Sequence, residues 1–229
     1  MKHREYHTIK FTITDTMGHL VLDQPPSNKM TLDFFNELYH LVRCLRKEKE
    51  IKGLVISGNG RHFSSGTDLQ AILDAIEKKT IFNDSGRPVH FPGFLAKNYS
   101  SLQIMEQLPF PVVAAIQGVC LGSAMELALF SHFRFCSEDA VFGLPESTFN
   151  LIPGLGGIIK VSHLSGKARA MEMIMRGNTF PASEALRFGL VDGIISKKEL
   201  ISRSFLFARS VSSGYRMEKR NLFLRKYFE

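Results

Sequence analysis

Several residue types and patterns are scarce or missing in this chain of 229 residues, and each absence excludes a class of protein. There is no tryptophan, and no cluster of basic and aromatic residues of the kind that marks RNA-binding modules. No apolar run approaches the roughly 18 residues that a membrane-spanning helix needs. The first residues lack the apolar region of a secretory signal, so we expect none. We therefore expect a protein that neither enters a membrane nor binds nucleic acid.

Cysteine is also scarce, with only Cys44, Cys120 and Cys136 and no CxxC pair among them. An odd, sparse set indicates reduced, buried thiols in a cytoplasmic protein rather than a disulfide framework. The histidines are scattered without the spacing of a metal site, so we expect no bound metal. A P-loop is missing, and the glycines of 154–157 lack the later glycine of a dinucleotide fingerprint.

Positive charge, by contrast, is plentiful. The formal net charge is +7, which suits a polyanionic partner such as nucleic acid or a phosphate-rich small molecule. Charge alone does not distinguish these partners from an ordinary solvated basic surface. Since no nucleic-acid motif accompanies the charge, the phosphate-rich small molecule is the partner class to test.

Strand and helix patterns alternate through the first two thirds of the chain. Residues 8–14 and 19–23 predict a hairpin, and Thr31 is a candidate N-cap for a helix with apolar residues at helical spacing. Apolar runs at 53–57 and 112–116 predict buried strands, each followed by a glycine-containing turn and a helix. Helices dominate the last third. This order indicates an α/β fold with a helical end.

The remaining segments give weaker patterns. Residues 79–93 are polar and contain proline and glycine, so we expect a loop there. Short strands are predicted at 133–136 and 140–143, and a strand start at 189–192. Ser183 is a candidate helix N-cap.

Two carboxyl groups beside glycine-containing loops form the most informative pattern in the sequence. Glu126 falls in an otherwise apolar helix after the turn at 118–122, and Glu146 follows a bend at 143–145. A buried glutamate is costly unless it is paired or functional. The alternatives are a helix-edge glutamate that reaches solvent for Glu126, and a glutamate stabilised by a helix N-terminus for Glu146.

Backbone donors are expected next to these carboxyls. Small residues in 62–68 and 118–123 allow N–H groups to face a ligand oxygen. Chemistry at the α-carbon of a carbonyl compound needs such parts, because one group moves the proton while donors hold the enolate-like oxyanion. A tight turn without a ligand is the alternative for each segment. Asp68, which opens a helix, is most simply explained by its stabilisation of that helix end.

Taken together, these segments resemble the enoyl-CoA hydratase/isomerase family, the crotonases. Six motifs follow the family's order within roughly residues 8–200, at 28–30, 63–69, 118–126, 142–146, 152–157 and 182–193. The resemblance implies an α/β spiral of ββα units over residues 1–195. It also implies a short helical C-terminal region, 196–229, that makes homotrimers, often paired into hexamers. The implied ligands are acyl-CoA thioesters; coenzyme A is then part of the substrate, and no separate cofactor is expected.

The motif match also implies roles for individual residues. The family's two catalytic glutamates fall on Glu126 and Glu146, and the backbone N–H groups of its oxyanion hole fall on Thr67 and Ser123. The family usually has alanine and glycine at these last two positions, so this chain adds two hydroxyl groups near the thioester oxygen. The substrate-binding positions that the match implies are Asn28, Lys29, Ser65, Gly66, Asp68 and Gly122.

The presence of both glutamates implies an enoyl-CoA hydratase. In that reaction one glutamate deprotonates water for attack on Cβ, and the other supplies a proton to Cα. Double-bond isomerisation or another acyl-CoA transformation is the first alternative, since many members of the family lack one or both glutamates. A homologue that binds CoA or RNA without turnover is the second alternative.

Overall fold

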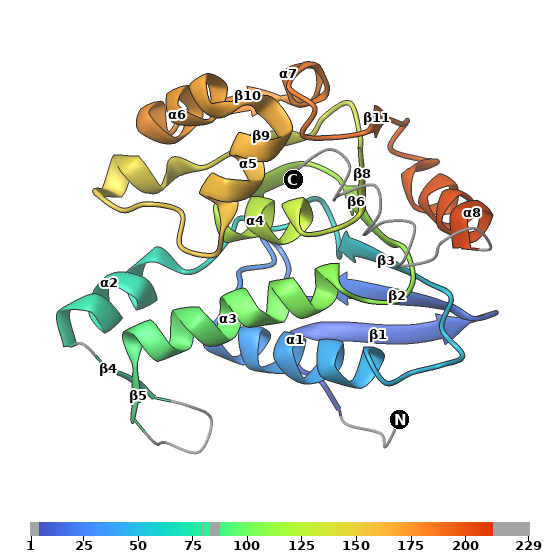
Figure 1. Cartoon of the computed structure of the whole chain (residues 1–229), viewed down its shortest axis with the longest axis horizontal. Helices are drawn as coiled ribbons and strands as arrows, with labels where there is room; N and C mark the ends of the chain where they lie inside the picture. Colours follow the sequence, from blue (N-terminus) through green and yellow to red (C-terminus); the bar gives the residue numbers. More distant parts are fainter. Residues whose placement is uncertain (1–4, 79, 83–87, 213–229) are drawn as a thin grey trace, which may run out of the picture.

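The computed structural model describes residues 5–78, 80–82 and 88–212. Its main sheet has the strand order β1-β2-β3-β6-β8-β11. Only the β1–β2 pair is antiparallel, and every later neighbour is parallel. Parallel neighbours need crossover connections, which here run through helices and loops (Figure 1). The strands are β1 (Ile9–Thr14), β2 (Met17–Leu22), β3 (Gly53–Gly58), β6 (Val112–Ile116), β8 (Phe133–Cys136) and β11 (Gly193–Ile194).

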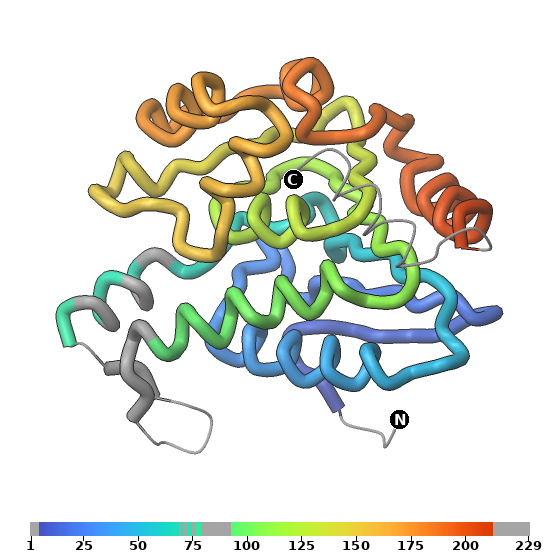
Figure 2. The backbone as a smooth tube through the Cα atoms, in the orientation of Figure 1, coloured from blue at the N-terminus to red at the C-terminus, as the bar shows by residue number. Residues whose placement is uncertain are grey.

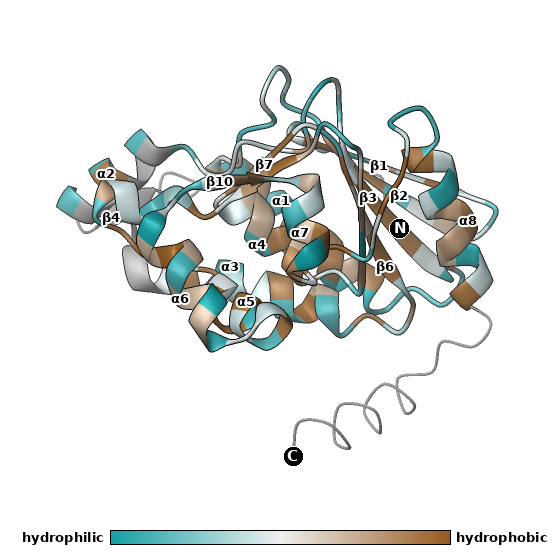
Figure 3. Ribbon diagram, turned by 90° about the horizontal axis from the view of Figure 1, so that it is seen from above, coloured by the Kyte–Doolittle hydropathy of each residue, from teal (hydrophilic) through white to brown (hydrophobic). Residues whose placement is uncertain are grey.

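Helices cover both faces of this sheet. Figure 3 shows α8 (Leu200–Ser212) on one side of β3 and β6, and α1 (Leu32–Leu45) on the other. The alternation of side chains along β3 explains the two-sided burial. Leu54 and Ile56 join the larger core, whereas Val55 packs in a second cluster that includes residues of α8.

A smaller sheet, with the order β10-β9-β7, carries the loops of interest. It consists of β7 (Val119–Leu121), β9 (Val141–Gly143) and β10 (Thr179–Pro181). β6, β7 and α4 (Ser123–Leu129) follow one another as a ββα unit, and β8 and β9 begin a further unit that continues into the 3-10 helix η1 (Pro145–Phe149). This repetition agrees with the predicted spiral.

The remaining elements extend the molecule around this centre. In the tube of Figure 2, the yellow and orange segments lie above the blue N-terminal hairpin, with the light green α4 between them. These elements are α2 (Leu69–Lys78), β4 (Thr80–Phe82), β5 (Pro88–His90), α3 (Phe91–Glu106), α5 (Gly157–Ser165), α6 (Lys167–Arg176) and α7 (Ala182–Arg187). No helix in the described part of the chain is long and apolar enough to cross a bilayer.

Two local predictions near the N-terminus are confirmed. β1 and β2 form the expected hairpin, and its two-residue turn places Asp15 (φ 47°) and Thr16 (φ 69°) in the left-handed region. Positive φ at both central residues is the requirement of the turn type that matches strand twist. Thr31 caps α1, since its side chain accepts a hydrogen bond from the N–H of Phe34 at 3.3 Å.

Three other local predictions are wrong. The expected loop at 79–93 contains the paired strands β4 and β5 and the start of α3, while residues 79 and 83–87 lie outside the described residues. Ser183 is inside α7, because Pro181 is still extended (φ −78°, ψ 170°) and caps the helix. The strand expected at 189–192 starts later, because Gly189 (φ 71°) first turns the chain after α7.

The C-terminal region is described only in part. α8 confirms the predicted helix as far as Ser212, and residues 213–229 lie outside the described part of the chain. Trimer formation through residues 196–229 therefore stays a prediction.

Candidate active site

Glu126 is buried in α4, with 1% of its surface exposed, so the solvent-reaching alternative is excluded. Its Oε1 accepts two hydrogen bonds of 2.8 Å, from the N–H groups of Leu155 and Gly157 at the start of α5. Burial raises the pKa of Glu126 to about 7, and the negative charge of Glu146 adds to this rise, whereas the two amides oppose it. Since both amides donate to Oε1, the Oε2 atom of Glu126 accepts a hydrogen bond from neither of them.

Glu146 lies next to Gly122, the residue that precedes α4. A Cβ placed on Gly122 would lie 3.1 Å from Oε1 of Glu146. Burial raises the pKa of Glu146, so stabilisation by a helix end does not control this carboxyl group. Its Oε2 is buried and has no hydrogen-bond partner among the described residues. A buried oxygen in this state is costly unless a ligand or a water satisfies it.

The two carboxyl groups therefore form one electrostatic unit. Gly122, which is next to the Glu146 carboxyl group, has φ 55° and ψ −127°, and its carbonyl accepts the N–H of Glu126 at 3.0 Å. Because the charge of Glu146 acts on the pKa of Glu126, the protons are lost from the pair in two coupled steps. When such a pair holds a single proton, one group is an acid and the other is a base in the same site.

Thr67 and Ser123 supply two free backbone donors beside this pair. Within the described residues, neither residue's N–H donates a hydrogen bond. The loops that carry them are adjacent, since bridge pairs join Met30 to Thr67 and Ser64 to Cys120. Their side-chain hydroxyl groups are 2.6 Å apart. Free amides on neighbouring loops are what an oxyanion hole requires.

Gly66 and Ser65 shape the loop that presents Thr67. Gly66 has φ 87°, and a Cβ there would lie 2.5 Å from the carbonyl oxygen of Leu121, so only glycine fits. The carbonyl of Gly66 accepts the N–H of Met30 at 3.0 Å. The N–H of Ser65 donates to the carbonyl of Ser27 at 2.9 Å. These contacts hold the loop against the segment before α1.

Three other predicted binding residues have structural contacts. Asn28 is 2% exposed, and its side-chain amide donates to the carbonyls of Asn59, His62 and Phe63. Its side chain therefore braces the turn before Thr67. Lys29 forms an ion pair with Asp68 at 3.1 Å near the surface. Asp68 also accepts the N–H of Gln70 at 3.0 Å, which explains its place before α2.

The hydrogen bonds from the N–H groups of Leu155 and Gly157 to Glu126 were not predicted from the sequence. Gly157 lies so close that an added Cβ would be 2.8 Å from Cγ of Glu126. The glycine run at 154–157 is the pattern that could have identified them, but it was interpreted only as a weak dinucleotide motif and as part of the family motif at 152–157. Glycine is needed here to let the backbone approach a carboxylate rather than a phosphate.

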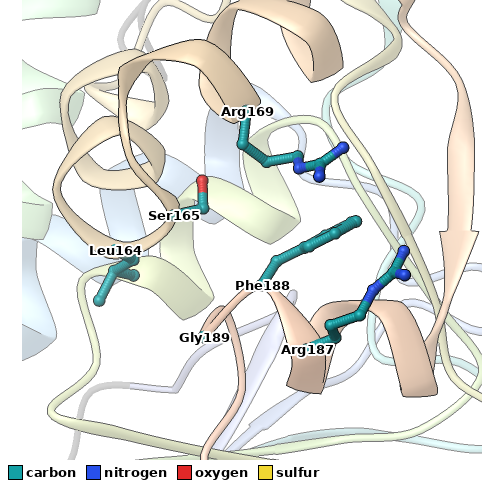
Figure 4. A pocket seen from close by; sticks show the side chains of 6 residues that line it. All are labelled: Leu164, Ser165, Arg169, Arg187, Phe188 and Gly189. Atoms are coloured by element: carbon teal, nitrogen blue, oxygen red, sulfur yellow. The ribbon is translucent and has the colours of Figure 1, made fainter.

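A separate pocket of about 460 Å³ lies between α5, α6 and α7 (Figure 4). Its lining residues are Leu164, Ser165, Arg169, Arg187, Phe188 and Gly189, and it contains neither carboxyl of the pair. The guanidinium groups of Arg169 and Arg187 lie 4.5 and 4.9 Å from the centre of the Phe188 ring. Each also pairs with a glutamate of its own helix, so these contacts brace the helices.

The cysteines agree in part with expectation. Cys120 and Cys136 are buried free thiols, whereas Cys44 is half-buried. Burial raises the pKa of Cys136 to about 12, so it is a poor nucleophile at neutral pH. Among the described residues, no cluster of three or more His, Cys, Asp or Glu side chains could hold a metal ion.

The fold and the site define an α/β protein with paired acids beside free backbone donors. Sequence comparison then identifies its family: the Enoyl-CoA hydratase/isomerase family matches residues 12–222, and the chain belongs to this family. A curated relative, the peroxisomal Delta(3,5)-Delta(2,4)-dienoyl-CoA isomerase of Arabidopsis thaliana, is 32% identical over 209 residues, covering 87% of this chain and 74% of that protein. Because that relative is peroxisomal, a cytoplasmic location stays a prediction here.

Solved structures confirm the expected crotonase fold. A putative enoyl-CoA hydratase from Streptomyces coelicolor A3(2) superposes with a TM-score of 0.87 at 24% identity, covering 100% of this chain and 83% of that one. An enoyl-CoA hydratase from Bacillus anthracis has a TM-score of 0.79 at 28% identity, covering 90% and 77%. A putative enoyl-CoA hydratase from Thermobifida fusca YX, in complex with CoA, has a TM-score of 0.84 at 23% identity, covering 97% and 86%.

Proposed function

We propose that this protein adds water across the 2,3 double bond of a 2-enoyl-CoA thioester. The observation that carries the proposal is the coupled pair of the buried Glu126 and the half-buried Glu146, both with raised pKa values. Hydration needs an acid and a base on one side of a double bond, and this pair supplies both when it holds a single proton. The CoA complex of the relative from Thermobifida fusca supports a CoA thioester as the ligand class.

In the proposed mechanism, the thioester oxygen accepts hydrogen bonds from the N–H groups of Thr67 and Ser123. These bonds draw electron density from the conjugated double bond and make Cβ electrophilic. They strengthen as the oxygen becomes enolate-like, and a single donor of this kind contributes roughly 10²–10³-fold to turnover.

The two glutamates then divide the proton transfers. Glu126 takes a proton from water while the water oxygen attacks Cβ, and Glu146 gives its proton to Cα as the enolate collapses. The amides of Leu155 and Gly157 keep one oxygen of Glu126 fixed, so its other oxygen can meet the water. The unpartnered Oε2 of Glu146 is the oxygen suited to face Cα.

The decisive experiment follows the loss of enoyl absorbance with a panel of 2-enoyl-CoA thioesters of increasing chain length, beginning with crotonyl-CoA. Wild type is compared with Glu126→Gln and Glu146→Gln, which keep side-chain shape and remove the titrating group. We expect turnover by wild type alone, with acyl-CoA binding retained in both variants. Hydration at the wild-type rate by either variant would overturn the proposal.

Isomerisation is the second candidate, because the Arabidopsis thaliana relative is named a dienoyl-CoA isomerase. The same pair could remove a proton from one carbon and return one to another, without consuming water. A 3,5-dienoyl-CoA substrate distinguishes the two reactions, since isomerisation produces the absorbance of a conjugated 2,4-diene and incorporates no ¹⁸O from labelled water. If neither substrate reacts while CoA still binds, the non-catalytic alternative is favoured.

A homotrimer or hexamer is part of the same proposal. It rests only on what the resemblance to the family implies for the C-terminal helical region. Sedimentation of the full chain tests it directly, and a monomer at micromolar concentration would contradict it.

A further inference from the structure

We propose that the side-chain hydroxyl groups of Thr67 and Ser123 form a clamp that fixes the separation of the two amide donors. We call the Thr67 Oγ1–Ser123 Oγ hydrogen bond the hydroxyl clamp. Its catalytic meaning rests on the proposed function, because the same two residues present the N–H groups of the oxyanion hole. Both residues are departures from the alanine and glycine that the family usually has there.

The clamp joins residues that are 56 positions apart in the chain. Its oxygens are 2.6 Å apart, and the Ser123 hydroxyl also donates to the sulfur of Met30 at 3.5 Å. A hydroxyl has a single hydrogen to donate. When the Ser123 hydrogen is directed to sulfur, Thr67 is the donor within the clamp. The three side chains then form a continuous chain of contacts from Thr67 to Met30.

Backbone hydrogen bonds join the two loops only as far as Leu121. The N–H of Ser64 donates to Val119 at 3.0 Å, and the N–H of Leu121 donates to Ser64 at 3.2 Å. Gly122, with φ 55°, then turns the chain away. Within the described residues, no backbone hydrogen bond links Thr67 to Ser123 directly. The hydroxyl clamp is therefore the direct link at the end where both amides are free.

Burial indicates that the clamp acts on position rather than on the substrate itself. Met30 is fully buried, and its sulfur draws the Ser123 hydroxyl toward the protein interior. The amide donors keep their freedom to face a ligand, because the side chains satisfy each other. Thr67 and Ser123 are positioning residues in this respect: the hydroxyl groups hold the backbone, and the backbone contacts the oxyanion.

The first test separates positioning from simple stability. Thr67→Val and Ser123→Ala remove one hydroxyl each, the double variant removes both, and Thr67→Ser restores the hydroxyl. We expect kcat on crotonyl-CoA to fall about tenfold in each single variant with KM within about twofold, since small misplacement of donors affects the transition state most. The double variant should lose no more than the worse single variant, and Thr67→Ser should recover most of the rate.

Binding supplies a second readout. Acetoacetyl-CoA can bind as an enolate, whereas butyryl-CoA remains a neutral thioester. We expect both single variants to lose about tenfold in affinity for acetoacetyl-CoA while butyryl-CoA affinity changes less than twofold. Thr12→Val, an exposed threonine on β1, is the matched control and should change nothing. Equal losses for the two ligands, additive effects, or no recovery in Thr67→Ser would overturn the clamp.

A ligand-free measurement keeps this inference separate from the proposed function. Met30 and Leu121 have hydrogen-bonded N–H groups on either side of the clamp. Each single variant, but not Thr12→Val, should speed amide hydrogen exchange at both positions. Unchanged exchange would overturn the clamp even in an active enzyme. Faster exchange in the variants, together with a wild type that hydrates no thioester, would overturn only the proposed function.

Discussion

Two regions of the molecule bury glutamate side chains, and they supply them with hydrogen-bond donors very differently. In the N-terminal region, Glu37 of α1 is 6% exposed and accepts three hydrogen bonds. They come from the N–H of His7 at 2.8 Å, the N–H of Thr8 at 2.9 Å and the hydroxyl of Thr8 at 2.5 Å. In the site, Glu126 accepts two bonds on one oxygen, and Oε2 of Glu146 accepts none from the described residues.

This difference separates a structural carboxylate from a reactive pair. Donors on both oxygens of Glu37 compensate for its burial, so the side chain fastens the segment before β1 to α1. In the site, donors are fewer and a second acid is close, so the pKa of Glu126 rises to about 7. A group that titrates near the working pH is suited to proton transfer. We therefore expect changes at Glu37 to affect stability, and changes at Glu126 or Glu146 to affect catalysis.

The largest expected effect is on catalysis by Glu146→Gln. Glutamine keeps the shape of the side chain but has no acidic proton, so turnover of 2-enoyl-CoA should fall by roughly 10²–10⁴-fold. Steady-state kinetics and calorimetric binding of butyryl-CoA measure the two quantities separately, and binding should be retained. A variant that loses turnover and binding together would indicate a structural role, and would remove the contrast with Glu37.

The reverse behaviour is expected for Glu37→Ala. Two buried donors of Thr8 and the part-buried N–H of His7 would lose their acceptor, which should lower the free energy of unfolding by about 3 kcal/mol. Turnover per folded molecule should stay the same, because α1 contributes no residue to the carboxyl pair. Chemical denaturation and kinetics at low temperature check both parts. Glu50→Ala, an exposed glutamate, is the control and should leave stability unchanged.

Gly122→Ala would place a methyl group in the space next to Oε1 of Glu146. An added Cβ would lie 3.1 Å from Oε1 of Glu146 at a backbone φ of 55°, so turnover should fall by about 10²-fold. Gly60→Ala is a matched control, since Gly60 also has a positive φ (77°) but no atom within 4 Å of an added Cβ. Both variants should lose stability through backbone strain, but only Gly122→Ala should lose turnover. Equal turnover in the Gly122→Ala and Gly60→Ala variants would show that Glu146 does not need the space next to Gly122.

The smallest effect concerns pH. The pKa of Glu126 is raised in the folded chain from 4.5 to about 7, so the folded state binds this proton more tightly than the unfolded state. The associated stability is complete below about pH 4.5 and is lost as the pH rises through about 7. Wild type should lose about 2 kcal/mol of unfolding free energy between pH 5 and pH 8 that Glu126→Gln does not lose. A parallel pH dependence in both proteins would contradict the raised pKa.

The pH dependence of kcat/KM should reflect the titration of the two carboxyl groups. The reaction needs one of the two carboxyl groups ionised and the other protonated, so kcat/KM should pass through a maximum as the pH rises. The two limbs of this profile report apparent pKa values of the coupled pair rather than of either residue. A flat profile between pH 5 and pH 9 would argue against both assignments.

Local patterns were enough to predict much of the fold. The β1–β2 hairpin, the Thr31 cap and the strands around residues 53 and 112 depend on neighbouring residues, and all are present. Glu126 and Glu146 were also found, because a lone acid among apolar residues is visible without a structure. The order of the motifs added the family resemblance, and the comparison with known proteins confirmed the family.

Contacts between distant segments could not be predicted in this way. Glu126 receives the amides of Leu155 and Gly157 only because α4 and α5 meet in space, about thirty positions apart in the chain. Asn28 was expected at the substrate, yet its amide is directed to three backbone carbonyls. The start of α7 was predicted at the wrong residue, because Pro181 is compatible with a strand end as well as with a helix start.

The electrostatic link between the two acids has one more consequence under the proposed reaction. Each hydration leaves Glu126 protonated and Glu146 ionised. This is the reverse of the protonation state in which the cycle began. Before another turnover the proton must return from Glu126 to Glu146. Because the two groups already feel each other's charge, one bridging water could carry this return. The protein would then reset itself without help from buffer, and turnover should be insensitive to buffer concentration.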